Sequence, residues 1–431
     1  MDCGLFQGSR TWREQNWAEP RFDPTTLSAV LLTHAHIDHI GMLPRYYTAG
    51  LSCPVFTSPA TADLAALLLA DSGRLHEEEA QYRSAHGKSR HMPPLPLYTE
   101  SDAQNSIALL RPVPINESIS VSSRVKAEWR PMGHILGACS IQLQVNSKLI
   151  TFSGDIGRYQ QPILVDPRPQ TLGDLLLIES TYGNRRHPST IEPCDALQTV
   201  ITDTVNRGGI VLIPSFAVGR TQTILYYIQE LKAAKKIPDI PIIVDSPMAR
   251  DATAIYQNHT SEYDQEASEM LRRGLAPFTP SKMHFIRNRD ESIALNSIDA
   301  PMVLLSASGM LSGGRILHHL KHRISDPRNT LLFVGYQPPG SRGDWILRGN
   351  SSLTIFGEEF PIRAQVAEIS GLSAHADSEE LIRWCRSCSG TPNNVAIVHG
   401  EPRSAKHFGN RLLDELGWQT FVPDYLQTVT L

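Results

Sequence analysis

The hexad HAHIDH, which begins at His34, places three histidines and one aspartate directly after an apolar run. Imidazole nitrogens and carboxylate oxygens together form a ligand set that zinc prefers in proteins. If the hexad is a loop behind a strand, its side chains give two ligand pairs, His34 with His36 and Asp38 with His39. A row of surface histidines is the alternative, but a dense ligand cluster at a strand end is a specific signal. Because two ligands do not fill a zinc site, the sequence predicts further ligands elsewhere.

Three more candidate ligands stand beside glycines at predicted strand ends. His134 lies in PMGHILGACS, Asp155 lies in FSGDIG, and His399 lies in IVHGE. Loops at strand ends are the segments that reach into clefts. Taken singly, each of the three also fits a capped turn or an ordinary loop histidine, so the residues alone leave the ligand role open.

The elements that must position these residues follow two patterns. Residues 141–145 alternate strictly between apolar and polar side chains, and residues 146–147 then form a turn into residues 148–152, which predicts an antiparallel hairpin with one solvated face. Elsewhere, short apolar runs alternate with helical patterns, which predicts an α/β protein with buried strands. The runs expected to form these strands are 30–32, 175–178, 210–213, 242–244, 302–305, 331–334 and 395–398.

Composition bounds the class of protein and its partners. A chain of 431 residues is long enough to form two domains. Its 41% hydrophobic and 19% charged residues are ordinary for a globular protein with a buried core. No run approaches about 18 consecutive apolar residues, so we expect no membrane partner. Six thinly spread cysteines and the absence of a signal-peptide pattern favour a cytoplasmic protein. The net charge of -4 means that a nucleic acid would have to be held by a local cleft.

The motifs THAHIDHIG, GHILGA, SGDIG and VHGE resemble those of the metallo-β-lactamase fold. The resemblance implies two Zn²⁺ per chain and seven ligands. One zinc would be held by His34, His36 and His134, the other by Asp38, His39 and His399, with Asp155 as the bridge.

The middle of the chain is similar to the β-CASP branch of that superfamily, the RNA-processing nucleases related to the pre-mRNA 3′-end processing endonuclease. IESTYGNR resembles motif A, with Glu179 as its acid, and LSAHAD resembles motif B, with His375. A histidine at motif C, here His399, implies RNA rather than DNA as the substrate. The implied fold is an αββα sandwich with an inserted α/β domain, whose parallel sheet is flanked by helices. The expected ranges are 1–182 and 372–431 for the lactamase domain and 183–371 for the β-CASP domain.

The implied activity is hydrolysis of single-stranded RNA by a zinc-dependent ribonuclease in RNA processing or decay. A water activated by two metals would attack the phosphodiester, and Asp38 would accept its proton. His375 would protonate the leaving ribose oxygen, with Glu179 orienting the imidazole and holding it protonated. Endonuclease and 5′-exonuclease modes both remain open, as does a homodimer.

Loops of the inserted segment offer candidate phosphate contacts. Ser215 and Arg220 follow one predicted strand at a helix start, and Ser308 and Arg315 follow another. Such loops expose backbone N–H groups and the positive end of a helix dipole to an anion. Helix capping by serine is the alternative. We predict these four residues as substrate-binding.

Two departures from the family pattern stand out. GYQPPGSRGDW replaces a basic position with Asp344, which leaves a phosphate contact of that loop in doubt. The segment DCG begins at Asp2, so the first strands of the sandwich are expected to be absent, or to have been lost from the sequence through a misassigned start, which we favour. If the strands are absent, we expect the hexad to lose the support of Asp2 and its neighbours. The alternatives are therefore a small-molecule hydrolase of the lactamase or glyoxalase type, or a catalytically weakened RNA-binding relative.

Overall fold

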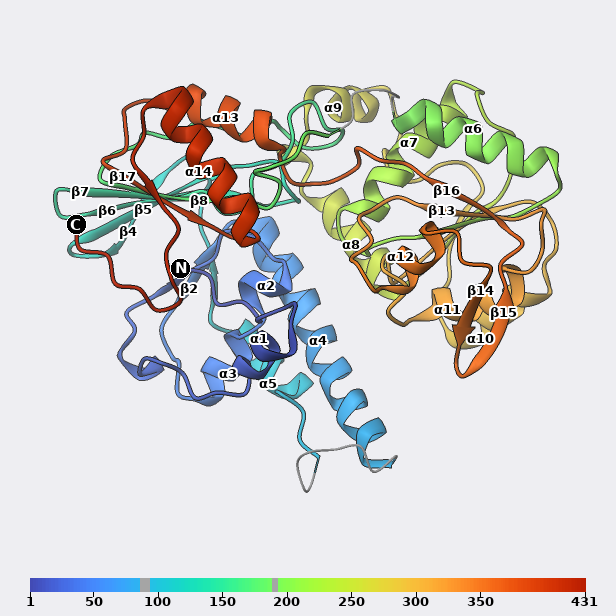
Figure 1. Ribbon diagram of the computed structural model, residues 1–431, viewed down its shortest axis with the longest axis horizontal. Helices are drawn as coiled ribbons and strands as arrows, with labels where there is room; N and C mark the ends of the chain where they lie inside the picture. Colours follow the sequence, from blue (N-terminus) through green and yellow to red (C-terminus); the bar gives the residue numbers. More distant parts are fainter. Residues whose placement is uncertain (86–93, 188–192) are drawn as a thin grey trace. The chain divides into compact units, whose positions relative to one another are not determined.

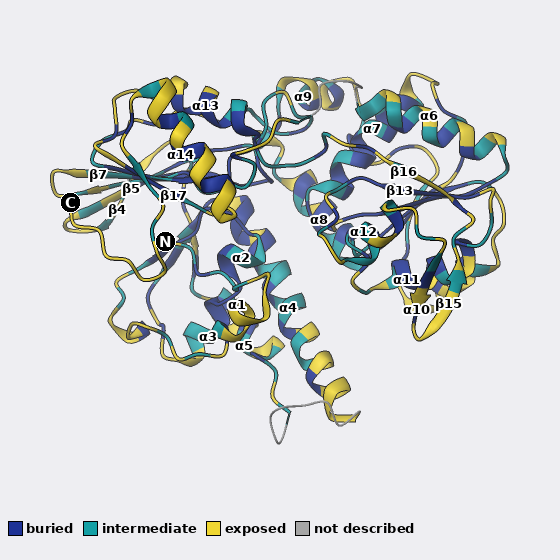
Figure 2. Cartoon of the chain, in the orientation of Figure 1, coloured by how far each residue is buried: buried dark blue, intermediate teal, exposed yellow. Residues whose placement is uncertain are grey.

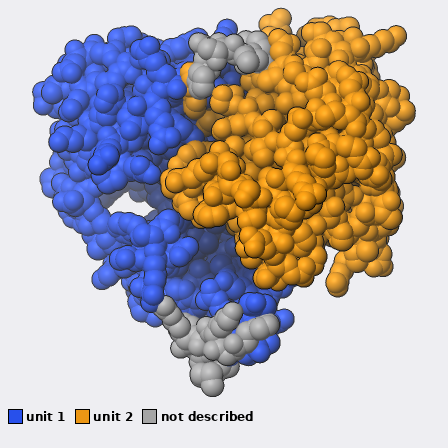
Figure 3. Space-filling view, turned by 45° about the vertical axis from the view of Figure 1, so that its right-hand side comes forward, with its two compact units in different colours: residues 1–186, 375–431 blue, residues 187–374 orange. Residues whose placement is uncertain are grey.

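The computed structural model of the chain describes residues 1–85, 94–187 and 193–431 (Figure 1). The chain forms two compact units, one made of residues 1–186 and 375–431 and the other of residues 187–374 (Figure 3). The predicted α/β class is confirmed, since parallel and mixed sheets in both units are flanked by helices. The assignment of residues 183–371 as a separate functional domain stays a prediction. Within the described residues, no helix combines the length and the apolar character needed to cross a bilayer.

The first unit contains a seven-stranded mixed sheet in the order β18-β17-β8-β7-β6-β5-β4. The predicted hairpin is present, because β6 and β7 are antiparallel and Val145 pairs with Lys148 at their turn. From β7 to β18 the neighbouring strands run parallel, which brings the ends of β8 and β17 to the same edge. The strands are β4 (Ser118–Ser122), β5 (Val125–Pro131), β6 (Cys139–Val145), β7 (Lys148–Phe152), β8 (Leu175–Glu179), β17 (Asn394–Val398) and β18 (Thr420–Phe421).

A small parallel sheet packs against this large one and completes a sandwich. It consists of β1 (Val30–Leu31), β2 (Val55–Thr57) and β3 (Leu110–Pro112). Leu31 of the small sheet joins Trp129 and Ile141 of the large sheet in one buried cluster. The Trp129 indole also donates a hydrogen bond of 3.0 Å to the carbonyl of Leu32. The two sheets are therefore fixed to each other by apolar burial and by a hydrogen bond just before the HAHIDH hexad.

Helices cover the outer faces of the sandwich. Helices α13 and α14 lie on the large sheet (Figure 1), where Trp384 and Phe408 are fully buried in its core cluster. A capping box of Asp377 and Glu380 fixes the start of α13. The helices of this unit are α1 (Arg10–Gln15), α2 (Ile37–Ile40), α3 (Leu43–Thr48), α4 (Pro59–Ala85), α5 (Glu100–Ile107), α13 (Ser378–Ser387), α14 (Pro402–Leu416) and the 3-10 turn η1 (Pro24–Thr26).

The second unit is built on a fully parallel six-stranded sheet in the order β11-β10-β12-β9-β13-β16. Its central strands are buried along their whole length, as Figure 2 shows by their dark blue colour. That explains why their sequences read as continuous apolar runs rather than alternating ones. The strands are β9 (Val211–Pro214), β10 (Ile242–Asp245), β11 (Met283–Phe285), β12 (Val303–Ser306), β13 (Thr330–Phe333) and β16 (Gln365–Glu368).

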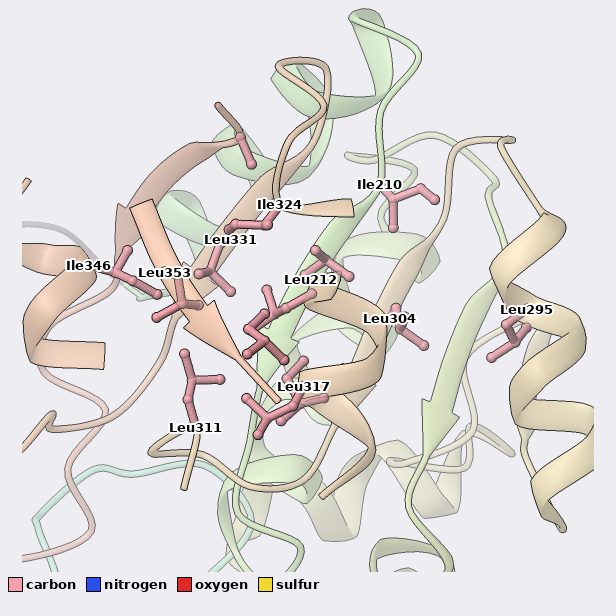
Figure 4. Close-up of a cluster of buried hydrophobic side chains, with 14 of the residues drawn as sticks. Ile210, Leu212, Leu295, Leu304, Leu311, Leu317, Ile324, Leu331, Ile346 and Leu353 are labelled. Atoms are coloured by element: carbon pink, nitrogen blue, oxygen red, sulfur yellow. The ribbon is translucent and has the colours of Figure 1, made fainter. Parts of the chain in front are cut away.

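Helices and a hairpin surround this parallel sheet. In Figure 4, Leu212 of β9, Leu304 of β12 and Leu331 of β13 meet Leu317 of α11 in one buried cluster. The hairpin contributes Leu353 to the same cluster. The remaining elements are α6 (Pro193–Asn206), α7 (Arg220–Ala233), α8 (Pro247–Asn258), α9 (Gln265–Arg272), α10 (Arg289–Ala294), α11 (Arg315–Arg323), α12 (Arg342–Leu347), β14 (Ser352–Ile355), β15 (Glu358–Pro361), and the 3-10 turns η2 (Thr260–Glu262) and η3 (Leu295–Ser297).

Candidate metal centre

The HAHIDH hexad is half loop and half helix. His34 follows β1, His36 is the N-cap of α2, and Asp38 and His39 lie within that helix. The prediction of a loop throughout is therefore wrong for its second half. The cause is local, because the carbonyl of His36 accepts hydrogen bonds from the backbone N–H of His39 and of Ile40, at 2.8 and 3.1 Å. The helical turn sends Asp38 and His39 to one group of ligands while His34 and His36 face another.

The first ligand group consists of His34, His36, His134 and Asp155. Nδ1 of His36 lies 3.1 Å from Nε2 of His34 and 3.1 Å from Nε2 of His134. Oδ2 of Asp155 lies 3.4 and 3.3 Å from the same two Nε2 atoms. A single proton can satisfy only one of these nitrogen pairs, whereas one cation can satisfy all four atoms.

The second ligand group consists of Asp38, His39 and His399. Nε2 of His39 lies 3.2 Å from Nε2 of His399, which is also 3.5 Å from Oδ2 of Asp38. Oδ1 of Asp155 approaches this group as well, at 3.4 Å from Nε2 of His39 and 3.5 Å from Nδ1 of His399. Within the described residues, Oδ1 of Asp155 is buried and has no hydrogen-bond partner. An unsatisfied buried carboxylate oxygen between two histidines fits a metal ligand.

Electrostatics favour the protonation states that a metal requires in the first group. Burial lowers the pKa of His36 to about 3 and also lowers the pKa values of His34 and His134. Burial opposes the charge on Asp155, but the surrounding histidines hold its pKa well below the usual value. Neutral imidazoles and an ionised carboxylate are the ligand forms that bind divalent cations.

Asp2 supports the metal loop from outside the two ligand groups. Its carboxylate accepts hydrogen bonds of 2.8 Å from the backbone N–H and the hydroxyl of Thr33. The same carboxylate lies 2.8 Å from Nδ1 of His39, and the Thr33 hydroxyl lies 3.1 Å from Nδ1 of His34. Both imidazoles thus have their Nδ1 atoms engaged, which leaves Nε2 for a metal. The N–H of Asp2 also donates a hydrogen bond of 2.9 Å to the carbonyl of Leu31, so in this structure Asp2 supports the hexad and does not lose its place there.

Thr181 holds His399 in a backbone conformation that non-glycine residues rarely adopt. His399 has a φ of 49°. The Thr181 hydroxyl donates a hydrogen bond of 3.0 Å to the carbonyl of His399 and lies 3.2 Å from its Nδ1. The hydroxyl therefore fixes both the backbone and the imidazole of this ligand candidate. Sequence reasoning missed Thr181, although it stands two residues after Glu179 in the motif IESTYGNR.

Glu179 and His375 form a pair beside Asp155. Nδ1 of His375 lies 3.2 and 3.3 Å from the two carboxylate oxygens of Glu179, and its Nε2 lies 3.9 Å from Oδ2 of Asp155. The Glu179 side chain is 1% exposed, whereas the His375 side chain is 20% exposed. Burial opposes a charge on His375, but Glu179 and Asp155 raise the pKa of its imidazole overall. The pair is held in place by a hydrogen bond of 2.6 Å from the N–H of Ile156 to Glu179.

The four predicted substrate-binding residues all lie in the second unit, at the carboxyl ends of β9 and β12. These neighbouring strands pair in parallel, with Ser306 opposite Pro214. Arg220 and Arg315 are the first residues of α7 and α11, and Ser308 is partly exposed. Ser215 is buried, and its hydroxyl accepts a hydrogen bond of 3.0 Å from Thr221. Its geometry therefore fits a supporting role in the loop better than direct contact with a substrate.

Arg315 is held by a buried carboxylate in this unit. Its Nη1 lies 2.6 Å from Oδ1 of Asp245, whose other oxygen is 2.6 Å from Nε2 of His319 and accepts a bond of 2.5 Å from Ser292. The Asp245 side chain is fully buried, and the Arg315 side chain is 28% exposed. The guanidinium is thus fixed in position while part of it still reaches the surface.

Comparison with known proteins identifies the class to which this fold and site belong. The Beta-Casp domain matches residues 221–346, the Zn-dependent metallo-hydrolase RNA specificity domain matches residues 359–423, and the metallo-beta-lactamase superfamily matches residues 8–50. The protein named Ribonuclease TTHA0252 of Thermus thermophilus is 37% identical over 412 residues, which cover 96% of this chain and 90% of that protein. The chain belongs to the β-CASP branch of the metallo-β-lactamase superfamily.

Two archaeal relatives match over similar lengths. An RNase J-like protein of Methanocaldococcus jannaschii is 31% identical over 430 residues, covering 98% of this chain and 91% of that protein. Transcription termination factor FttA of the same organism is 30% identical over 444 residues, covering 100% of this chain and 67% of that protein.

Proposed function

We propose that this chain is a metal-dependent ribonuclease that hydrolyses phosphodiester bonds of single-stranded RNA, with two Zn²⁺ held by the two ligand groups. The observation that carries the proposal is the position of Asp155, whose two carboxylate oxygens face different groups of histidines. A shared carboxylate between two such groups supports a pair of adjacent metals. The names of the relatives, a ribonuclease and an RNase J-like protein, support RNA as the substrate.

The chain's own residues supply proton transfer around the metals. When bound, two Zn²⁺ would polarise the phosphodiester and make a hydroxide nucleophile available near neutral pH. Asp38, within its ligand group and partly exposed, is the proposed acceptor of the proton from the attacking water. His375 is the proposed donor to the leaving ribose oxygen. Because its Nδ1 faces Glu179, the proton would leave from Nε2, the ring nitrogen that points toward Asp155.

The second unit is proposed to hold the RNA backbone. Arg220, Ser308 and Arg315 lie at the carboxyl edge of a parallel sheet, where α/β proteins commonly bind anionic ligands. The histidine at position 399 favours RNA over DNA. The alternative of a weakened RNA-binding relative is disfavoured, because all seven candidate ligands converge in two groups.

The test is cleavage of 5′-labelled and 3′-labelled single-stranded RNA and DNA by purified protein of measured metal content. We expect about two zinc ions per chain, RNA cleavage that a chelator abolishes and zinc restores, and weaker activity on DNA. The two labels also separate internal cleavage from removal of nucleotides at the 5′ end. Hydrolysis of nitrocefin or of thioesters without action on RNA would instead establish the small-molecule hydrolase.

A further inference from the structure

Phe216 is an exposed aromatic residue at the carboxyl edge of the parallel sheet. It belongs neither to the two ligand groups nor to the four residues predicted to bind substrate. It follows β9, and 42% of its surface is accessible to solvent. Strand β9 lies between β12 and β13 in the sheet, so the loops after those two strands flank Phe216. A single exposed apolar residue is common on protein surfaces. What sets Phe216 apart is how firmly the surrounding loops hold it.

The ring of Phe216 lies against two glycines of the flanking loops. A Cβ on Gly309 would lie 3.0 Å from Cδ2 and 3.1 Å from Cε2 of the ring, and one on Gly335 would lie 3.9 Å from Cε2. Neither glycine has a positive φ, so backbone conformation does not demand a glycine at either position. At Gly309 a methyl group would also lie 3.1 Å from the backbone nitrogen of Phe216, and these contacts are tighter than most real Cβ contacts, so Phe216 would have to shift by a few tenths of an ångström.

Hydrogen bonds fix both the loops and the residue. The Gln337 side chain donates 2.9 and 3.1 Å bonds to the carbonyls of Gly309 and Gly335, which clamps the two glycines together. The carbonyl of Phe216 accepts a bond of 2.7 Å from the Thr221 hydroxyl. The backbone that carries the ring and the glycines against which it lies are therefore fixed before any ligand arrives, so binding would cost little ordering entropy.

The neighbouring groups have the chemistry of a nucleotide site. Tyr336, directly after Gly335, is 49% exposed and adds a second aromatic surface to the same edge. Ser308, directly before Gly309, is partly exposed, and Arg315 is fixed by Asp245 with part of its guanidinium at the surface. Proteins that bind single-stranded nucleic acid combine aromatic rings for base stacking with cationic and hydroxyl groups for the backbone.

We propose that Phe216 is a stacking platform for one base of single-stranded RNA, with Ser308 and Arg315 contacting the phosphate next to that base. The inference rests on the proposed ribonuclease function and extends it to a base-binding subsite of the second unit. Stacking on a phenylalanine ring tolerates any base, so the subsite selects unpaired RNA rather than a particular sequence.

The test measures binding of single-stranded RNA to metal-loaded chains that carry His375→Ala, so that the RNA stays intact. In this background, Phe216→Ala is expected to weaken binding about 5- to 150-fold, the range seen when one stacking residue is removed. Phe216→Tyr keeps an aromatic face and should bind within about 3-fold of the parent, whereas Phe216→Leu should resemble alanine. The matched control is Phe356→Ala, which removes a phenylalanine that is 55% exposed, at the turn between β14 and β15, and should leave binding unchanged.

A second measurement locates the stacked base in the RNA. Abasic sites placed one at a time along the RNA should weaken binding to the parent chain at one position, and Phe216→Ala should add no further loss there. Unchanged binding of RNA by both Phe216→Ala and Phe216→Leu would overturn the proposal. So would a loss of affinity from Phe216→Ala that is the same for intact RNA and for RNA with the abasic site at that position. If the wild-type chain cleaves RNA in a metal-dependent way but Phe216 proves irrelevant, only the stacking subsite fails. If it neither binds nor cleaves RNA, the proposed function fails with it.

Discussion

The carboxylate of Asp2 lies 2.8 Å from Nδ1 of His39, which joins the start of the chain to the second ligand group. Through its bonds to Thr33, the same carboxylate also fixes the segment just before His34. One residue outside the ligand groups thus orients candidate ligands of both. Partners of this kind set the tautomer of a metal-binding imidazole and strengthen the metal site.

Replacing Asp2 with asparagine is expected to weaken metal binding about 10- to 100-fold. The amide oxygen of asparagine can still accept the Thr33 N–H, but the amide nitrogen cannot accept a proton from His39. Metal affinity should be measured by competition with a chromogenic chelator. Asp23→Asn is the matched control, since Asp23 makes similar bonds to Thr25 but lies outside both ligand groups. Equal affinities for both variants would contradict the role of Asp2.

Thr181→Val should weaken binding of the metal held by His399 by a similar factor, about 10- to 100-fold. Valine keeps the shape of threonine but removes the hydroxyl that bonds to the carbonyl of His399 and approaches its Nδ1. Thr181→Ser retains the hydroxyl and should behave like the wild type. Metal content after dialysis against a weak chelator separates the two variants, and a full complement in Thr181→Val would rule out this role.

The buried Asp245 should make the stability of the second unit depend on pH. Burial would raise the pKa of Asp245, but hydrogen bonds from His319, Ser292 and Arg315 lower it below the usual value. A carboxyl whose folded pKa is lowered stabilises the protein above its unfolded pKa, near 3.8, and that stability is lost as the pH falls through the folded value.

Asp245→Asn is therefore expected to lower the free energy of unfolding by about 3 kcal/mol at pH 7, because it leaves Arg315 and His319 without their anionic partner. The difference in the free energy of unfolding between the wild type and this variant should narrow below about pH 4, because the carboxyl of the unfolded wild-type chain takes up a proton there while the native carboxylate stays ionised. Urea unfolding at several pH values checks this. Asp239→Asn is the control, an exposed carboxylate paired with Lys232 and Lys282, whose loss should have little effect. A difference in the free energy of unfolding that stays constant down to pH 3 would contradict the lowered pKa of Asp245.

The ligand candidates could be found from the sequence because each is a metal-binding residue type at a strand end. His134, Asp155 and His399 are separated by many residues, yet the strand-end pattern singled them out, and the structure brings them to the hexad. Strand positions were readable for the same reason, since buried parallel strands such as β9 and β12 are uninterrupted apolar runs. The helical half of the hexad was not readable, because α2 has only four residues, too few to display a helical pattern.

Partners of the site residues were harder to predict, because a hydrogen bond between distant residues leaves no local pattern. Thr181 meets His399 across 218 positions of the chain. His319 could have been singled out. It stands three residues after the buried Ile316 and four before the buried Arg323, which is the spacing of the inner face of a helix. His319 is the histidine whose Nε2 meets the buried carboxylate of Asp245.

The central claim is that RNA is cleaved at the ligand groups with His375 as the proton donor. The most direct measurement compares His375→Ala with the wild type for both zinc content and cleavage of single-stranded RNA. We predict that the variant retains about two zinc ions per chain while its cleavage rate falls about 10²- to 10⁴-fold, as expected for loss of a general acid. The control is His318→Ala, which removes an exposed histidine from α11. It should change neither the zinc content nor the cleavage rate. Full cleavage by His375→Ala with its zinc retained would contradict the account.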